Sequence, residues 1–284
     1  MRLNAVNILG ISIINSPKKE VLEEIQRGLT VPVQKSIKTG NIAGKIITVF
    51  TPNAEQLVHA RKNPAFASVL NQADIAIPDS AGIVWADKIL SSSGAKHSNS
   101  VIPAPIPGVE FMEDMVSFAA KRHVPIGLIG GRDNLAVETL HCLQKTYSGL
   151  SGWAENGPEV TTGKSGLDFK DIDEKNYFSV LASKIEHEDT HMVFVALGPP
   201  KQEYFILQLK LELSKIKHYP IVLMAVGGSF DVVSGRLPRA PVLFRKPGLE
   251  WLWRLILQPW RIFRQLALVE FIWMVVTEKF RRDQ

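Results

Sequence analysis

Short apolar runs alternate with amphipathic helical patterns along almost the whole chain. Six of these runs are predicted as strands: 5–9, 45–50, 74–78, 124–130, 191–198 and 220–227. Because the runs are apolar nearly throughout, both faces of their sheet should be covered by helices, as in parallel sheets. The intervening segments fit such helices; in 16–29, for example, Ser16 suits the N-cap and Pro17 the first helical position. The alternation predicts an α/β fold with a doubly wound parallel sheet.

Composition narrows the class of protein further. Of 284 residues, 45% are hydrophobic and 21% are charged, which excludes disorder on a large scale. The single cysteine, Cys142, excludes an intramolecular disulfide and fits the reducing cytosol as a buried structural thiol. Residues 1–20 lack the long apolar region and cleavage site of a signal peptide, so their apolar run is interpreted as a strand. The most apolar run, 266–276, carries Glu270 and falls short of the ~18 residues expected of a transmembrane helix.

Positive charge is concentrated in the C-terminal part of the chain. Residues 236–284 hold ten Lys/Arg and four Asp/Glu, a net charge of +6, whereas the other 235 residues carry about −1. Four of the six tryptophans lie there too: Trp251, Trp253, Trp260 and Trp273. Basic residues interleaved with tryptophan are typical of nucleic-acid or anionic-membrane binding, and the aliphatic runs beside the arginines favour the membrane. We therefore predict a main domain at 1–240 and a basic, aromatic helical appendage at 241–284; a helix packed on the core is the alternative.

Ligands of doubly wound sheets bind beyond the carboxyl ends of the strands. The residues that directly follow the predicted strands are therefore the candidate site residues. They are Thr51, Asn53, Asp79, Gly130, Gly131, Lys201, Gln202, Glu203, Gly228 and Asp231. Their positions predict one ligand site along one edge of the sheet.

Most of these candidates have a structural interpretation beside the functional one. Asp79 is placed to act as a general base on a hydroxyl, yet position alone favours an N-cap of the next helix. Asn53 also fits an N-cap, and the cap interpretation is favoured there as well. Lys201 and Gln202, in the loop GPPKQE, suit a diphosphate and a sugar or base about as well as a solvated helix start.

Signals for nucleotide and metal binding are weak. The Gly130–Gly131 pair could approach a phosphate but is no G-x-G-x-x-G fingerprint, and Arg236 and Arg239 fit pyrophosphate recognition or an ordinary surface equally well. The seven histidines form no ligand-spaced set. One D-x-D pattern, 171–173, falls in the polar loop 157–173, where a solvated helix start is the better interpretation. No metal ion and no cofactor is predicted.

Five ordered blocks resemble the WecG/TagA/CpsF glycosyltransferases. They are TPNAEQLVHARKNPAFASVLNQADIAIPD (51–79), VPIGLIGG (124–131), VFVALGPPKQE (193–203), VGGSFDVVSGRLPRAP (226–241) and GLEWLWRLILQPWRIFR (248–264). Each block alone is a weak signal, but their family order across nearly the whole chain is specific. The resemblance implies a Rossmann-like, inverting, metal-independent glycosyltransferase. It would move a sugar, typically of N-acetylmannosamine type, from a UDP-sugar to a polyprenyl-diphosphate-linked sugar.

The resemblance also implies roles for single residues. Asp79 matches the family's proposed catalytic base, Thr51 and Asn53 its polar pocket residues, and Gln202 the glutamine of its G-x-P-K-Q-E loop. The basic positions of the family's appendage are matched by Arg254, Arg261 and Arg264. On physical grounds Pro259 should bend or break the helix that would carry these arginines.

The chain departs from the family pattern at three places. Ser80 stands where a glycine is usual, Pro105 where an arginine is usual, and Glu110 where an aspartate is usual in the same block as Pro105. The segment 153–160 (WAENGPEV) stands where the family usually has H-N-G-Y-F, and the aromatic residue that follows the glycine in that pattern is lost here. The missing arginine would anchor substrate charge, so these departures leave the donor sugar open.

Because the implied acceptor is insoluble in water, we predict a cytoplasmic protein that its basic, aromatic appendage holds at the inner face of the cell membrane. Its predicted partners are the UDP-sugar donor, the lipid-linked acceptor of cell-surface polysaccharide synthesis and the anionic membrane, with no nucleic acid. The polysaccharide pathway and a homo-oligomeric state are left open. A non-catalytic binder of nucleotide-sugars or nucleic acid is the alternative function, since fold does not fix function. An NAD-dependent oxidoreductase is disfavoured, because no G-x-G-x-x-G follows the first strand.

Overall fold

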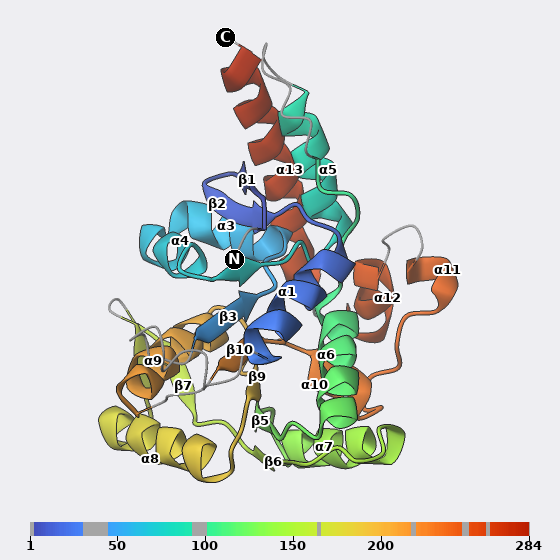
Figure 1. Ribbon diagram of the computed structural model, residues 1–284. Coiled ribbons are helices and arrows are strands. Elements are labelled where there is room, and N and C mark those ends of the chain that lie inside the picture. Colours follow the sequence, from blue (N-terminus) through green and yellow to red (C-terminus); the bar gives the residue numbers. More distant parts are fainter. Residues whose placement is uncertain are drawn as a thin grey trace.

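The computed structural model describes residues 3–30, 45–92, 101–163, 166–216, 220–245, 250–259 and 262–283. Within them, the central sheet has six parallel strands in the order β4-β3-β10-β9-β5-β6 (Figure 1). The strands are β3 (Ile46–Phe50), β4 (Ile75–Ala76), β5 (Ile126–Gly130), β6 (Gly152–Glu155), β9 (Met192–Ala196) and β10 (Ile221–Ala225). This arrangement, with helices on both faces, confirms the predicted Rossmann-like fold class.

One predicted strand lies outside the sheet. The run 5–9 forms β1 (Ala5–Ile8), which pairs antiparallel with β2 (Ile11–Ile14) in a separate hairpin. The reason is the turn between them: Leu9 and Gly10 both have positive φ, and Asn7 Oδ1 accepts a hydrogen bond from the Gly10 N–H at 2.9 Å. The chain therefore folds back at once, and this part of the sequence prediction is wrong.

Three strands carry no apolar run and were not predicted. β6 is an edge strand whose residues are all half-buried, so its sequence lacks the signal of a central strand. Inside the predicted polar loop 157–173, β7 (Val160–Thr162) and β8 (Leu167–Phe169) form a second antiparallel hairpin. Its strands are three residues each, too short for an alternating pattern to stand out.

Successive residues of the central strands pack into two separate cores, one on each face of the sheet. In β9, for instance, Val193 and Val195 belong to one core, Met192 and Phe194 to the other. The first core is covered by α3 (Ala54–Lys62), α4 (Pro64–Leu70), α5 (Ala81–Ser91), α8 (Glu174–His187), α9 (Lys201–Ile216) and α13 (Ile262–Asp283). The second is covered by α1 (Lys18–Thr30), α6 (Gly108–Arg122), α7 (Leu135–Thr146) and α10 (Ser229–Val233).

The C-terminal helices are α11 (Val242–Arg245), α12 (Glu250–Leu257) and α13. The gap between α12 and α13 surrounds Pro259, which confirms the predicted helix break. α13 runs beside α5 and α3 (Figure 1), where Phe271 and Val275 are fully buried in the first core. Lys62 Nζ on α3 also pairs with Glu270 Oε2 at 2.6 Å. α13 is therefore packed on the core.

Candidate active site

The carboxyl ends of the central strands open into one cleft of about 1490 Å³. Neighbouring strands lead to helices on opposite faces: α9 after β9 lies on the first core, whereas α7 after β5 lies on the second. Such a divergence opens a crevice at the strand ends, where ligands of these folds bind. Eight of the predicted site residues line the cleft: Thr51, Asn53, Asp79, Gly131, Lys201, Gln202, Gly228 and Asp231.

The other five predicted site residues lie elsewhere or outside the description. Gly130 and Glu203 do not line the cleft; Gly130 packs against β9, where an added Cβ would lie 2.7 Å from the Ala196 carbonyl carbon. Arg254 lies in α12 and Arg264 in α13. Arg261 lies outside the described residues.

Asp79 is half-buried where β4 leads into α5. The N-cap of α5 is Ser80, so the predicted capping role of Asp79 on this helix is wrong. Asp79 Oδ1 instead accepts a hydrogen bond from the backbone N–H of Gly108 at 2.7 Å. Gly108 begins α6, and the positive end of that helix attracts the carboxylate.

The approach of Asp79 to α6 depends on a missing side chain. A Cβ on Gly108 would lie 3.3 Å from Asp79 Oδ1 and 3.2 Å from Thr51 Cγ2. Glycine at 108 therefore lets the ends of β3, β4 and α6 meet around the carboxylate. Thr51 itself is buried and lies 3.5 Å from the Ala225 carbonyl through its hydroxyl.

Asn53 has the predicted cap role while it lines the cleft. Its side chain accepts the Gln56 N–H at 3.1 Å, and Gln56 Oε1 accepts the Asn53 N–H at 3.3 Å, which forms a capping box on α3. The side chain of Asn53 is thereby fixed at the cleft edge.

Two buried glutamines that line the cleft, and a buried glutamate that contacts them without lining it, form what we call the cleft floor: Gln56, Gln202 and Glu203, which are 3%, 2% and 0% exposed. Glu203 Oε1 accepts hydrogen bonds from Nε2 of Gln56 and of Gln202, each at 2.9 Å. Gln202 Oε1 accepts the N–H of Gly227 at 3.0 Å. Complete burial raises the pKa of Glu203 to about 7, against the hydrogen bonds from the glutamines, which lower it.

Two basic side chains line the cleft at the starts of α9 and α7. Lys201 begins α9, and Arg132 precedes α7 after the Gly130–Gly131 turn. Within the described residues neither side chain has an ion-pair partner. Both are placed to meet a ligand's negative charge together with the backbone N–H groups of the two helix starts.

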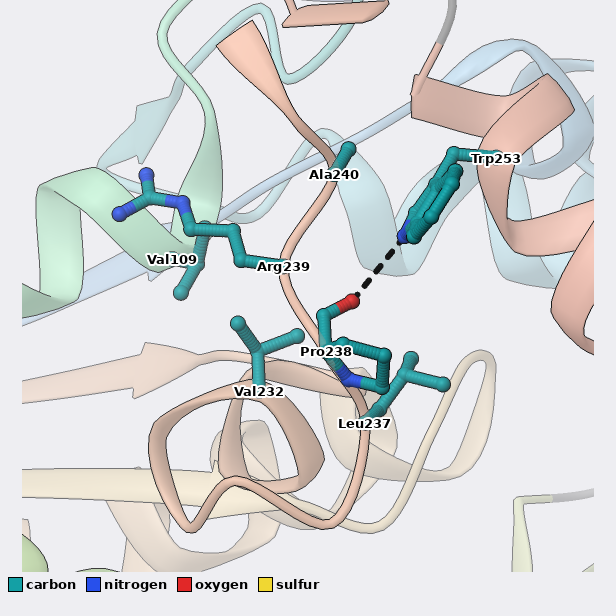
Figure 2. A pocket seen from close by; sticks show the side chains of 7 residues that line it. All are labelled: Val109, Val232, Leu237, Pro238, Arg239, Ala240 and Trp253. Atoms are coloured by element: carbon teal, nitrogen blue, oxygen red, sulfur yellow. Dashed lines mark hydrogen bonds between the residues drawn. The ribbon is translucent and has the colours of Figure 1, made fainter.

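Arg236 and Arg239, by contrast, are paired with carboxylates. Arg236 Nε lies 2.7 Å from Glu138 Oε2, and Arg239 lies 2.8 Å from Glu110 and 3.3 Å from Glu113. Figure 2 shows the Arg239 guanidinium turned away from Trp253. The pocket that Arg239 and Trp253 line has a volume of only about 10 Å³. These pairs favour the surface interpretation of both arginines.

The wall of the cleft beside Asp79 includes residues that sequence reasoning missed. Leu268, Phe271 and Ile272 of α13, which we call the α13 wall, line the cleft together with Trp85 of α5. Their spacing of three and four is a helical face pattern, which was the available signal. The cleft is also lined by Thr161 and other residues near the β7–β8 hairpin, for which the sequence carries no signal.

In the part of the chain that the structure describes, no group of three or more His, Cys, Asp or Glu side chains is placed to hold a metal ion. Of the D-x-D pattern, Asp173 is the N-cap of α8 and accepts the Lys175 N–H at 3.1 Å, which confirms the predicted helix start. Metal independence stays a prediction. Among the described helices, none is both long and apolar enough to cross a membrane.

The parallel sheet with a polar cleft at its carboxyl edge defines a Rossmann-like ligand-binding protein. The model of the "Glycosyl transferase WecG/TagA/CpsF family" matches residues 6–284, and the chain belongs to that family. One relative, from Bacillus spizizenii, is 30% identical over 80% of this chain and 78% of its own length. Another, from Staphylococcus aureus strain MRSA252, is 25% identical over 96% of this chain and 93% of its own length. Both are named N-acetylglucosaminyldiphosphoundecaprenol N-acetyl-beta-D-mannosaminyltransferase.

Proposed function

We propose that this protein transfers an N-acetylmannosamine-type sugar from a UDP-sugar to a polyprenyl-diphosphate-linked N-acetylglucosamine. The names of both relatives supply the transferred sugar and the acceptor. The observation that carries the proposal is the position of Asp79, a half-buried carboxylate at the carboxyl end of β4 that lines the cleft. The polar cleft floor suits a polar donor, and the apolar α13 wall suits a lipid-linked acceptor.

In the proposed reaction a hydroxyl of the acceptor attacks C1 of the donor sugar. The new C–O bond forms as the bond from C1 to the diphosphate breaks, and the electron pair leaves with UDP. Asp79 takes the hydroxyl proton, and a single displacement of this kind inverts C1. Lys201 and Arg132 are suited to the charge on the departing diphosphate, a role that needs no metal ion.

Two of the departures from the family pattern differ in where they lie. Pro105 lines the cleft, so the absent arginine removes a positive charge from the cleft itself. Glu110, by contrast, pairs with Arg239 at 2.8 Å, so the longer acidic side chain retains a cation partner. Of these two, the change at 105 is therefore the one that we expect to affect donor choice.

We further propose that residues 241–284 bind the inner face of the cell membrane, whereas 1–240 carry the reaction. Exposed large apolar side chains gather on this C-terminal part: Leu243, Ile256, Leu266, Val269, Ile272, Trp273 and Phe280. Such side chains next to basic residues suit an anionic lipid surface. The α13 wall would then lie between the lipid and Asp79.

The test is an assay with purified protein, a panel of UDP-sugars and a short-chain prenyl-diphosphate-N-acetylglucosamine. Release of UDP together with a disaccharide product, identified by mass spectrometry, is the expected result. Binding of UDP-sugars without release would favour a non-catalytic binder. Absence of both with every donor would contradict the proposal.

A further inference from the structure

The two glutamines of the cleft floor are oriented by one atom. Glu203 Oε1 accepts from the side-chain amide nitrogens of both Gln56 and Gln202. An oxygen that accepts two hydrogen bonds obliges each amide to turn its NH₂ group toward it. The carbonyl oxygen of each glutamine must then point the other way.

Each of these carbonyl oxygens holds the backbone of a loop at the cleft. Gln202 Oε1 accepts the N–H of Gly227, just after β10, and Gln56 Oε1 accepts the N–H of Asn53, just after β3. β3 and β10 are neighbours in the sheet. A flipped amide would set an NH₂ group against these N–H donors, and both loops would lose their hydrogen bond.

We infer that Glu203 is a positioning residue: its carboxyl fixes the amides of Gln56 and Gln202, and through them the Asn53 and Gly227 loops. Glu203 is fully buried and does not line the cleft, so it would act on a ligand only through the two glutamines. Its effect on donor binding rests on the proposed function, whereas its effect on the two loops does not.

A merely space-filling role would not require a carboxyl at this position. Glu203 Oε2 is buried and has no hydrogen-bond partner within the described ranges. A buried polar atom without a partner destabilises a fold, and an apolar side chain of similar size would avoid that loss. The acceptor oxygen Oε1 is therefore the feature that an apolar residue could not replace.

The experiment compares Glu203→Met, which removes the acceptor, with Glu203→Gln, which keeps an acceptor oxygen. Hydrogen exchange of the Asn53 and Gly227 amides is measured without ligand, and KM and kcat for UDP-N-acetylmannosamine are measured separately. The matched control is Asp87→Leu. Asp87 is 3% exposed, holds the Ile102 N–H at 2.7 Å and lies outside the cleft lining.

We expect Glu203→Met to speed exchange at both amides about tenfold or more and to raise KM by a similar factor, with a smaller change in kcat. Glu203→Gln should return both quantities to near wild-type values. Asp87→Leu should speed exchange at Ile102 and leave Asn53, Gly227 and KM unchanged.

Wild-type exchange at both amides in Glu203→Met would overturn the inference, and so would a Glu203→Gln variant that behaves like Glu203→Met. If Glu203→Met does not fold, the wild-type protein decides: the side-chain NH₂ groups of Gln56 and Gln202 should both be protected from hydrogen exchange, and fast exchange of either group would overturn the inference. Faster exchange at Asn53 and Gly227 in a protein that transfers no sugar would support the inference while the proposed function fails.

Discussion

The cleft floor is polar and enclosed, whereas the α13 wall is apolar and partly turned outward. Floor residues are at most 3% exposed and are joined by hydrogen bonds of about 3 Å. On the wall, Phe271 is fully buried, while its neighbour Ile272 is 44% exposed and belongs to the outer apolar surface of α13. Directional hydrogen bonds fix atoms, whereas apolar contact is non-directional. The difference suggests that the floor sets the geometry of the donor and the wall admits a lipid-linked acceptor.

The largest effect should follow a change at Asp79, the proposed catalytic base. Asp79→Asn keeps an oxygen for the Gly108 N–H but removes the base, so turnover should fall about 100- to 10,000-fold. Binding of the UDP-sugar should be nearly intact. Turnover is measured from steady-state rates, and UDP-sugar binding is measured by calorimetry. Asp87→Asn, a buried carboxylate outside the cleft, is the control, and wild-type turnover in Asp79→Asn would refute the assignment.

The two faces of α13 should respond differently to truncation of one aromatic side chain. Phe271→Ala opens a cavity in the core and should lower the free energy of unfolding by about 3 to 5 kcal/mol. Trp273 is 69% exposed, so Trp273→Ala should change the free energy of unfolding by less than about 0.5 kcal/mol. Urea unfolding of both variants decides. Equal losses would show that the assignment of buried and outward faces is wrong.

The floor should show a pH dependence that the wall lacks. Burial raises the pKa of Glu203 from 4.5 to about 7, so the folded chain holds this proton more tightly than the unfolded chain. Its contribution to stability is present at low pH and is lost as pH rises from about 4.5 to 7, a change of up to about 3 kcal/mol. The free energy of unfolding is measured with urea at pH 5 and pH 8 for the wild type and for Glu203→Gln. The difference between the two proteins at each pH isolates the contribution of the Glu203 proton. A difference independent of pH would count against the raised pKa.

The basic residues of the C-terminal part should act on membrane binding rather than on the fold. Changing Arg254, Arg261 and Arg264 to glutamate should weaken sedimentation with anionic liposomes by at least about 1 kcal/mol per residue, and added salt should weaken the wild type. Reversal of Lys121 and Arg122, exposed basic residues at the end of α6 in the main domain, is the control and should leave liposome binding unchanged. Unchanged binding of the triple variant would remove the membrane role from these arginines. Deleting α13 would be a poorer test, because it also exposes the first core.

The smallest expected effect is that of chelation. Because Lys201 and Arg132 are proposed to meet the diphosphate charge, turnover should be the same with and without EDTA. Loss of turnover that Mg²⁺ or Mn²⁺ restores would contradict metal independence, and Asp171 and Asp173 would be the first residues to change.

Sequence alone predicted five of the six strands of the central sheet, including the edge strand β4, and missed the other edge strand, β6. β3, β9 and β10 are buried on both faces, so their apolar runs stand out, whereas the half-buried edge strand β6 does not. The hairpin β1–β2 was missed as a hairpin because its turn, Leu9–Gly10, needs positive φ at a leucine. Turn conformation at such a residue is set by the contacts around it.

For the site, sequence predicted which residues reach the cleft but not how they are connected. Strand ends placed Thr51, Asp79 and Gln202 correctly at its lining. The hydrogen bond between Asp79 and Gly108 joins residues 29 positions apart in the sequence. The hydrogen bond between Gln56 and Glu203 joins residues 147 positions apart. No local pattern encodes such pairs. The burial of Glu203, one residue after a cleft-lining glutamine, depends on the rotation of α9 against the sheet.

The place of β10 in the sheet has a consequence for how the chain folds. β10 lies between β3 and β9, and Ile221 pairs with Ile46, 175 residues earlier. Until β10 inserts, β4–β3 and β9–β5–β6 cannot form one sheet, and the Gly227 bond of the floor cannot close. Contacts this far apart in sequence form slowly, and unpaired strand edges on intermediates invite aggregation. A nucleotide-sugar that binds the completed floor would bind only the late, fully paired species and so favour productive folding by mass action.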